Sequence, residues 1–166
     1  NKGYDHIIHF TISSKLSSMY SLFKGIAEEN YKDKLTIIDS YGLSSVMLAS
    51  VFCAFDDLNN GKSVEEICEK IESRKKDNAV SFVPENLKAL KNGGRVSPAI
   101  AAIGNTIGIK PVIVLKDGSL EKYKMIKNTK HAITDKFDEL IEEYPQDKYD
   151  YTIVQFDCKA STYDYI

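Results

Sequence analysis

Short apolar runs alternate with helix-spaced apolar residues along the first half of the chain. The segments 5–12 and 34–39 are short, apolar and rich in β-branched residues, which is typical of buried strands. Helical spacing of apolar residues predicts three helices, over 16–31, over 42–58 and from Val64 to Ile71. The helix over 42–58 is apolar nearly all round, so we expect it to be buried. Strands that alternate with helices predict a parallel sheet with right-handed crossovers.

Polar residues mark where these helices begin. Ser40 is a candidate N-cap for the helix over 42–58, and Ser63-Val-Glu-Glu66 has the pattern of a capping box. Two strands are too few for such a sheet, so we expect further strands from sequence that precedes residue 1. The chain opens with NKGYD, without an initiator Met, and closes with STYDYI, which reads as the start of another helix. These ends suggest a fragment of a longer protein.

The pattern changes after residue 78. A strand-like run over 79–84 is followed by a short helix over 85–94 that Gly93 closes. Two strands then flank Lys116-Asp117-Gly118-Ser119, where Asp-Gly signals a hairpin. A helix near 131–144 and a last strand over 149–156 complete the pattern. We therefore predict an α/β protein. Residues 1–78 form a partial three-layer α/β domain with a parallel sheet, and residues 79–166 form a partial α+β domain with an antiparallel sheet.

Composition excludes several classes of protein. The 166 residues are 43% hydrophobic and 28% charged, with a formal net charge of −2, so no basic field for nucleic acid is evident. No run approaches the roughly 18 apolar residues of a membrane span, and the first residues lack a signal-peptide pattern. Cys53, Cys68 and Cys158 are odd in number and scattered, which favours reduced thiols in a cytoplasmic protein.

Four serines follow the first strand and form a turn that is a candidate anion-binding site. They are Ser13, Ser14, Ser17 and Ser18, and a helix begins after them. Such a turn presents backbone N–H groups, hydroxyls and the positive end of a helix dipole, which suits a phosphate or a carboxylate. Simple capping of the helix is the alternative. The sequence has no GxGxxG after a strand and no GxxxxGK[ST], so nothing favours a nucleotide.

Five segments occur in the order and spacing of a known family. They are ISSKLSSMY (12–20), TIIDS (36–40), LKALKNGGRVS (87–97), IGNTIGIKPVIVLKDG (103–118) and KxxKHA (127–132). Together they resemble the DegV family of bacterial fatty-acid-binding proteins. The resemblance implies an N-terminal α/β domain, a C-terminal α+β domain and one fatty acid bound between them. It also implies a carrier without catalysis of its own, and some members serve as the acyl-carrying subunit of a fatty-acid kinase whose ATP-binding partner phosphorylates the carboxylate.

The resemblance also assigns roles to residues. Ser17 matches the serine expected to contact the carboxylate, Ser13 and Ser14 match the other hydroxyls, and Ser18 stands where the family usually has Gly. A helical stripe of Ile100, Ile103 and Ile107, with Ala99 and Ala102, is a candidate wall of the acyl-chain slot, although such a stripe is also ordinary core. Three basic residues are expected to face the partner or its phosphate: Arg95, Lys110 and Lys127, the last in place of the usual Arg. A Thr/Ser loop and a His-containing segment of the family are expected outside this sequence.

Other functions remain as alternatives. A sugar-phosphate-binding, isomerase-like domain would use the same serine turn for phosphate, but it needs a general base and a polar cavity, which the Ile/Ala stripe argues against. An interaction module would use the face around Arg95. The three histidines lack the spacing of a metal site, and Asp39, Asp56 and Asp57 do not form a convincing acid–base pair. We therefore expect no metal and no cofactor, and the resemblance implies a long-chain fatty acid as the ligand.

Overall fold

The computed structural model describes residues 3–84, 87–103 and 109–154. The chain divides into two compact units. Unit 1 contains residues 1–80 together with the hairpin tip 117–119, and unit 2 contains 81–116 and 120–166. The division falls after Val80, two residues beyond the boundary that the sequence predicts. In the described part of the chain, no helix is both long enough and apolar enough to cross a bilayer.

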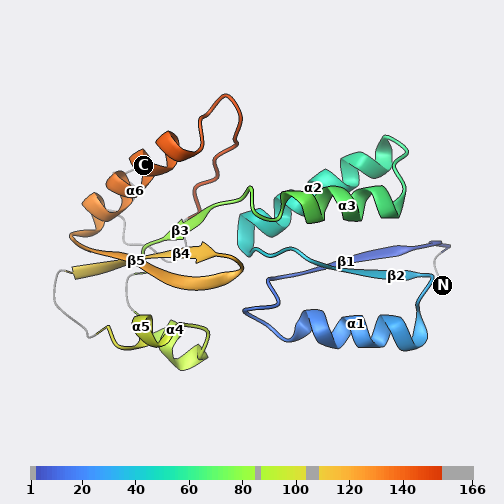
Figure 1. The fold of residues 1–166 in the computed structure, drawn as a ribbon, viewed down its shortest axis with the longest axis horizontal. Coiled ribbons are helices and arrows are strands. Elements are labelled where there is room, and N and C mark those ends of the chain that lie inside the picture. The colour runs from blue at the N-terminus through green and yellow to red at the C-terminus, as the bar shows by residue number, and fades with distance from the viewer. Residues whose placement is uncertain (1–2, 85–86, 104–108, 155–166) are drawn as a thin grey trace. The chain divides into compact units, whose positions relative to one another are not determined.

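Unit 1 is an α/β sandwich around a parallel pair of strands. The strands pair in register, with Ile7 opposite Leu35 and Thr11 opposite Asp39. One helix covers one face of this sheet and two helices cover the other, so the predicted three layers are present (Figure 1). In chain order the elements are β1 (Ile7–Thr11), α1 (Met19–Asn30), β2 (Leu35–Asp39), α2 (Ser44–Asn59) and α3 (Val64–Arg74).

The core of unit 1 lies between the sheet and the pair α2 and α3. Ile38 of β2 is buried together with Ala54 of α2 and Ile67 of α3. Ile67 belongs to the apolar face that the sequence predicts for α3, so helical spacing identified the buried side of this helix correctly.

The expectation that α2 is buried is wrong. Ala54 is its one buried residue, while Leu48, Phe52 and Phe55 expose 51%, 59% and 60% of their surfaces. The helix contacts β1 and α3. An apolar composition shows that a helix tolerates burial, but it does not show which faces find a neighbour within the unit.

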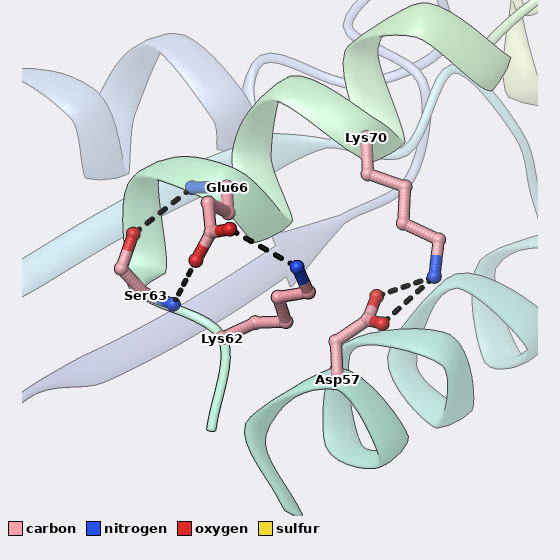
Figure 2. A network of polar contacts seen from close by, with 5 residues as sticks. All are labelled: Asp57, Lys62, Ser63, Glu66 and Lys70. Carbon is pink, nitrogen blue, oxygen red and sulfur yellow. Dashed lines mark hydrogen bonds and ion pairs between the residues drawn. The ribbon is translucent and has the colours of Figure 1, made fainter. Parts of the chain in front are cut away.

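Polar contacts fix the start of α3 and join it to α2 (Figure 2). The Ser63 hydroxyl accepts from the Glu66 N–H at 3.2 Å, and the Glu66 carboxylate accepts from the Ser63 N–H at 2.8 Å. This is the predicted capping box. The Lys70 ammonium donates to both oxygens of Asp57, at 2.7 and 2.8 Å, and so links α3 to the end of α2. Ser40, in contrast, does not cap α2, because that helix begins after Leu43.

Unit 2 has a three-stranded antiparallel sheet in the order β3-β4-β5, as predicted for the second half. Asp117 and Gly118 join β4 to β5 with φ values of 46° and 78°, which are the two left-handed residues of a tight hairpin turn. The short helices lie on one face of the sheet and α6 on the other (Figure 1). The elements are β3 (Val80–Phe82), α4 (Lys88–Gly93), α5 (Pro98–Ala101), β4 (Ile109–Lys116), β5 (Ser119–Lys127) and α6 (Thr129–Glu143).

Three local predictions for this half need correction, and two of them concern the short helices. Gly94, with φ of 64°, is the C-cap of α4, whereas Gly93 is its last helical residue. The helical stripe is also not continuous, because α5 ends at Ala101 and Ile103 follows it; Ile107 lies outside the described residues.

The described part of the expected last strand, 149–154, is not a strand. Its aromatic side chains pack against α6 and the residue that follows it. The Tyr151 ring lies 5.9 Å from the ring of Phe137, and the Tyr151 hydroxyl donates to the Tyr144 carbonyl. The alternating aromatic residues therefore make contacts with a helix and not strand pairing.

Candidate functional site

The serine turn lies at the carboxyl end of β1, beside the loop that follows β2. Because β1 and β2 run parallel, the chain leaves both strands at the same edge of the sheet, which is where open α/β sheets bind ligands. The turn covers residues 12–18 and ends at the start of α1. The neighbouring loop covers residues 40–43 and leads into α2. Both belong to unit 1.

Hydrogen bonds join the turn and the loop into one frame. Asp39, the last residue of β2, is 7% exposed, and its Oδ1 accepts from the Tyr41 N–H at 2.9 Å and from the Ser14 N–H at 3.2 Å. The Ser13 N–H donates to the Gly42 carbonyl at 2.9 Å. The position of the turn is therefore fixed by the loop beside it.

Ser13 is a structural part of this frame. It is fully buried, and its hydroxyl donates to the Gly118 carbonyl at 2.7 Å, at the hairpin tip that belongs to unit 1. The same oxygen accepts from the Lys15 N–H at 3.2 Å. A hydroxyl that is buried with one donated and one accepted hydrogen bond has little capacity left for a ligand.

The other three serines are more accessible. Ser14 and Ser18 are exposed, and Ser17 is half-buried. The Ser17 hydroxyl accepts from the Met19 N–H at 3.3 Å, while Ser18 is the N-cap of α1 without a side-chain capping bond. Capping of α1 is thus part of the role of Ser17. The turn also stands at the positive end of the α1 dipole, as the anion-site prediction requires.

The charges beside the turn are of both signs. The Asp39 carboxylate accepts from the Ser14 N–H, and Lys15 is an exposed residue of the turn itself. The Lys75 ammonium, at the end of α3, forms an ion pair with Glu72 and lies 5.7 Å from the centre of the Tyr41 ring in the neighbouring loop, a cation–π distance. Any anion at the turn would therefore meet one buried carboxylate as well as the cations and dipole that attract it.

The remaining predicted residues lie in unit 2. Ile100 is fully buried and Ile103 is half-buried. Arg95 is exposed and its Nη1 donates to the Gly93 carbonyl at 2.5 Å. Lys110 is half-buried on β4, and Lys127 is exposed at the end of β5. Their roles toward a ligand or a partner stay predictions.

Other titratable groups serve packing. The Lys124 ammonium of β5 donates to the Glu139 carboxylate of α6 at 2.6 Å, and this bond lowers the pKa of Glu139 and raises the pKa of Lys124. Burial raises the pKa of the Cys68 thiol, which disfavours the reactive thiolate form. Across residues 3–84, 87–103 and 109–154, no group of three or more His, Cys, Asp or Glu could hold a metal ion.

Sequence reasoning misses three residues of the frame, namely Asp39, Gly42 and Gly118. From the sequence, Asp39 is considered only for an acid–base pair and rejected, although the place of Asp39 at the carboxyl end of the second parallel strand is a signal for the shared edge. Gly42 is needed because a Cβ there would lie 2.5 Å from Val46 Cγ1. The contact of Gly118 with Ser13 joins residues 105 positions apart, which no local pattern reveals.

Comparison with known proteins shows the family to which this chain belongs. The family model described as "Uncharacterised protein, DegV family" matches residues 1–162. The chain belongs to the DegV family. A DegV domain-containing protein of Clostridium acetobutylicum is 32% identical over 143 residues, which cover 84% of this chain and 50% of that protein. The chain thus spans about half the length of the curated relatives that it matches.

Solved DegV structures share the fold. A DegV lipid binding protein from Thermotoga maritima superposes with a TM-score of 0.76 at 28% identity, over 87% of this chain and 50% of that one. The Streptococcus pneumoniae Fatty Acid Kinase B3 protein, solved with linoleic acid, has a TM-score of 0.70 at 28% identity, over 86% and 52% of the two chains. The mixed α/β class predicted from the sequence is therefore confirmed.

Proposed function

We propose that this chain is part of a fatty-acid carrier and that the serine turn, residues 12–18, holds the carboxylate of a long-chain fatty acid. The observation that carries the proposal is the position of the turn, at the carboxyl ends of two parallel strands and at the N-terminus of α1. The DegV proteins named above as lipid binding or loaded with linoleic acid support the ligand class.

The charges at the turn favour a carboxylate over a phosphate. Asp39 accepts a hydrogen bond from the Ser14 N–H and places a negative charge beside the turn. At any given distance, that charge opposes a dianion about twice as strongly as a monoanion. Charge-assisted hydrogen bonds of about 1.5–3 kcal/mol each, from two accessible hydroxyls, offset the smaller cost. This argues against the sugar-phosphate alternative.

Most of the affinity would come from the acyl tail. A tail of about 14 methylenes contributes on the order of 10 kcal/mol at about 0.8 kcal/mol each, before the costs of ordering. Ile100, Ile103 and Ile107 stay our proposed tail contacts. The complete burial of Ile100 fits a core residue as well as a slot wall, so it does not distinguish the two roles.

We extend the proposal to a kinase partner because a relative is named as a Fatty Acid Kinase B3 protein. The carrier would present the carboxylate to an ATP-binding subunit that performs the chemistry, and Arg95, Lys110 and Lys127 would face that subunit. The carrier itself would use no metal and no cofactor, and we expect it to act in the cytoplasm.

Lipid content tests the proposal. The natural gene product that contains this sequence is purified without added lipid, extracted with organic solvent and examined by mass spectrometry. About one fatty acid per polypeptide supports the carrier function. Recovery of a phosphorylated sugar, or of no small molecule, together with no binding of added fatty acid, overturns it.

A variant tests the site. Ser17→Ala removes the half-buried hydroxyl of the turn and is expected to lower fatty-acid occupancy at matched protein concentration. Ser73→Ala is the matched control, because Ser73 is an exposed serine of α3 whose hydroxyl donates within its own helix, to the Lys70 carbonyl. Equal occupancy in both variants and the wild type would remove Ser17 from the site.

A further inference from the structure

One buried carboxylate connects the two loops at the edge of the parallel sheet. Asp39 accepts from the Tyr41 N–H, two residues ahead, and from the Ser14 N–H, 25 residues away in the sequence. The first bond shapes the loop after β2, and the second ties that loop to the serine turn after β1. Asp39 is 7% exposed, so the acceptor of both bonds is largely removed from water.

A second path links the same loops and depends on the first. Tyr41 has φ of 55°, a left-handed conformation that an aromatic residue rarely adopts, and its N–H is the one bonded to Asp39. The chain continues to Gly42, whose carbonyl accepts from the Ser13 N–H. Asp39 therefore fixes the turn twice, directly through Ser14 and indirectly through Tyr41 and Gly42.

The direction of the Ser14 N–H has a consequence for the ligand. Because this N–H points to Asp39, it is not available to a bound anion, and the side chain of Ser14 leaves the backbone on the exposed side of the turn. A ligand at the turn would therefore be held through hydroxyls, whose positions depend on how the backbone of the turn is fixed.

We propose that Asp39 is a positioning residue for the carboxylate site: without touching the fatty acid, it holds the serine turn in the geometry that binds the head group. This inference rests on the proposed function. It predicts that the acceptor oxygen of residue 39 matters more than its charge. Asp39→Asn keeps an acceptor oxygen and removes the charge, while Asp39→Ala removes both.

The test compares two ligands of equal chain length, hexadecanoic acid and hexadecanol, on the delipidated natural gene product. For Asp39→Ala we expect the dissociation constant of the acid to rise about tenfold or more, as expected for loss of one charge-assisted hydrogen bond, and that of the alcohol to change less than about twofold. Asp39→Asn is expected to bind the acid at least as tightly as the wild type, because the positioning bonds remain and the charge that opposes the carboxylate is removed. Asp56→Ala, which removes an exposed carboxylate of α2, is the control and is expected to match the wild type.

A purely structural role would give a different pattern. Equal weakening of acid and alcohol by Asp39→Ala, or unchanged binding of both, overturns the proposal. Asp39→Asn behaving like Asp39→Ala also overturns it, because the charge and not the acceptor would then be responsible.

A measurement without ligand separates this inference from the function. Amide hydrogen exchange at Ser14 and Tyr41 is expected to accelerate together in Asp39→Ala and to stay slow in Asp39→Asn. If the wild type binds no fatty acid, the proposed function and the head-group role fail together. The exchange rates then show separately whether Asp39 fixes the turn. Unchanged exchange at Ser14 in Asp39→Ala would contradict the contact itself.

Discussion

Replacing Gly42 with Ala tests whether close packing holds the loop beside the serine turn. A Cβ at this position would lie 2.5 Å from Val46 Cγ1 and 3.1 Å from Val46 Cβ. Since non-bonded carbons approach to about 3.5–4.0 Å, the loop or α2 must move by roughly 1 Å. Val46 cannot easily turn away, because a β-branched residue in a helix has one strongly preferred rotamer. Overpacking of this kind costs about 1–3 kcal/mol.

The assay is urea unfolding of Gly42→Ala, with Gly25→Ala as a control of opposite sign. Gly25 lies inside α1 and a Cβ there meets nothing within 4 Å, so Ala is expected to stabilise the protein by about 0.5–1 kcal/mol. Gly42→Ala is expected to lower the free energy of unfolding and, because the Gly42 carbonyl holds the Ser13 N–H, to lower fatty-acid occupancy too.

The double variant Gly42→Ala/Val46→Ala identifies the cause. Shortening Val46 removes the methyl group that collides, so the double variant should be more stable than the sum of the single effects predicts, by about 1 kcal/mol or more. The reasoning is refuted if Gly42→Ala is as stable as the wild type, or if the two substitutions are simply additive.

Three further predictions concern local structure. Ser63→Ala removes one half of the capping box and is expected to lower the unfolding free energy by about 1 kcal/mol in a urea titration. The hydrogen bond from the Ser63 N–H, followed by that from Lys62, lowers the pKa of Glu66 below 4.5. Its stabilising effect is therefore present above the unfolded-state pKa and lost as the pH falls through the folded-state pKa, and Glu66→Gln should weaken the loss of stability on acidification through that range. At the end of α4, Gly94→Ala forces a Cβ into φ of 64° and should cost about 1 kcal/mol, whereas Gly93→Ala should be neutral or stabilising in the same assay.

Local signals predict the elements of this fold well. The capping box at Ser63, the Asp-Gly turn at 117–118 and the two apolar runs of the parallel strands all depend on residues within a few positions of one another. The errors arise where local signals are equally satisfied by two outcomes. Two adjacent glycines could each close α4, and only backbone conformation distinguishes Gly94 from Gly93. The apolar surface of α2 could be covered or open, and its neighbours decide which.

The serine turn shows the same limit more clearly, because four identical side chains close together in the sequence have different roles. The contact of Ser13 with Gly118 places its hydroxyl in the frame, and the contact of Ser14 with Asp39 places the Ser14 backbone there as well. Ser17 gives one lone pair to the first N–H of α1, which leaves its own O–H to donate. A carboxylate needs donors, so a serine that accepts from the helix and donates outward suits the ligand better than one whose proton is already used. On this argument, removal of the Ser17 hydroxyl should reduce fatty-acid occupancy, whereas Ser13→Ala should first reduce stability.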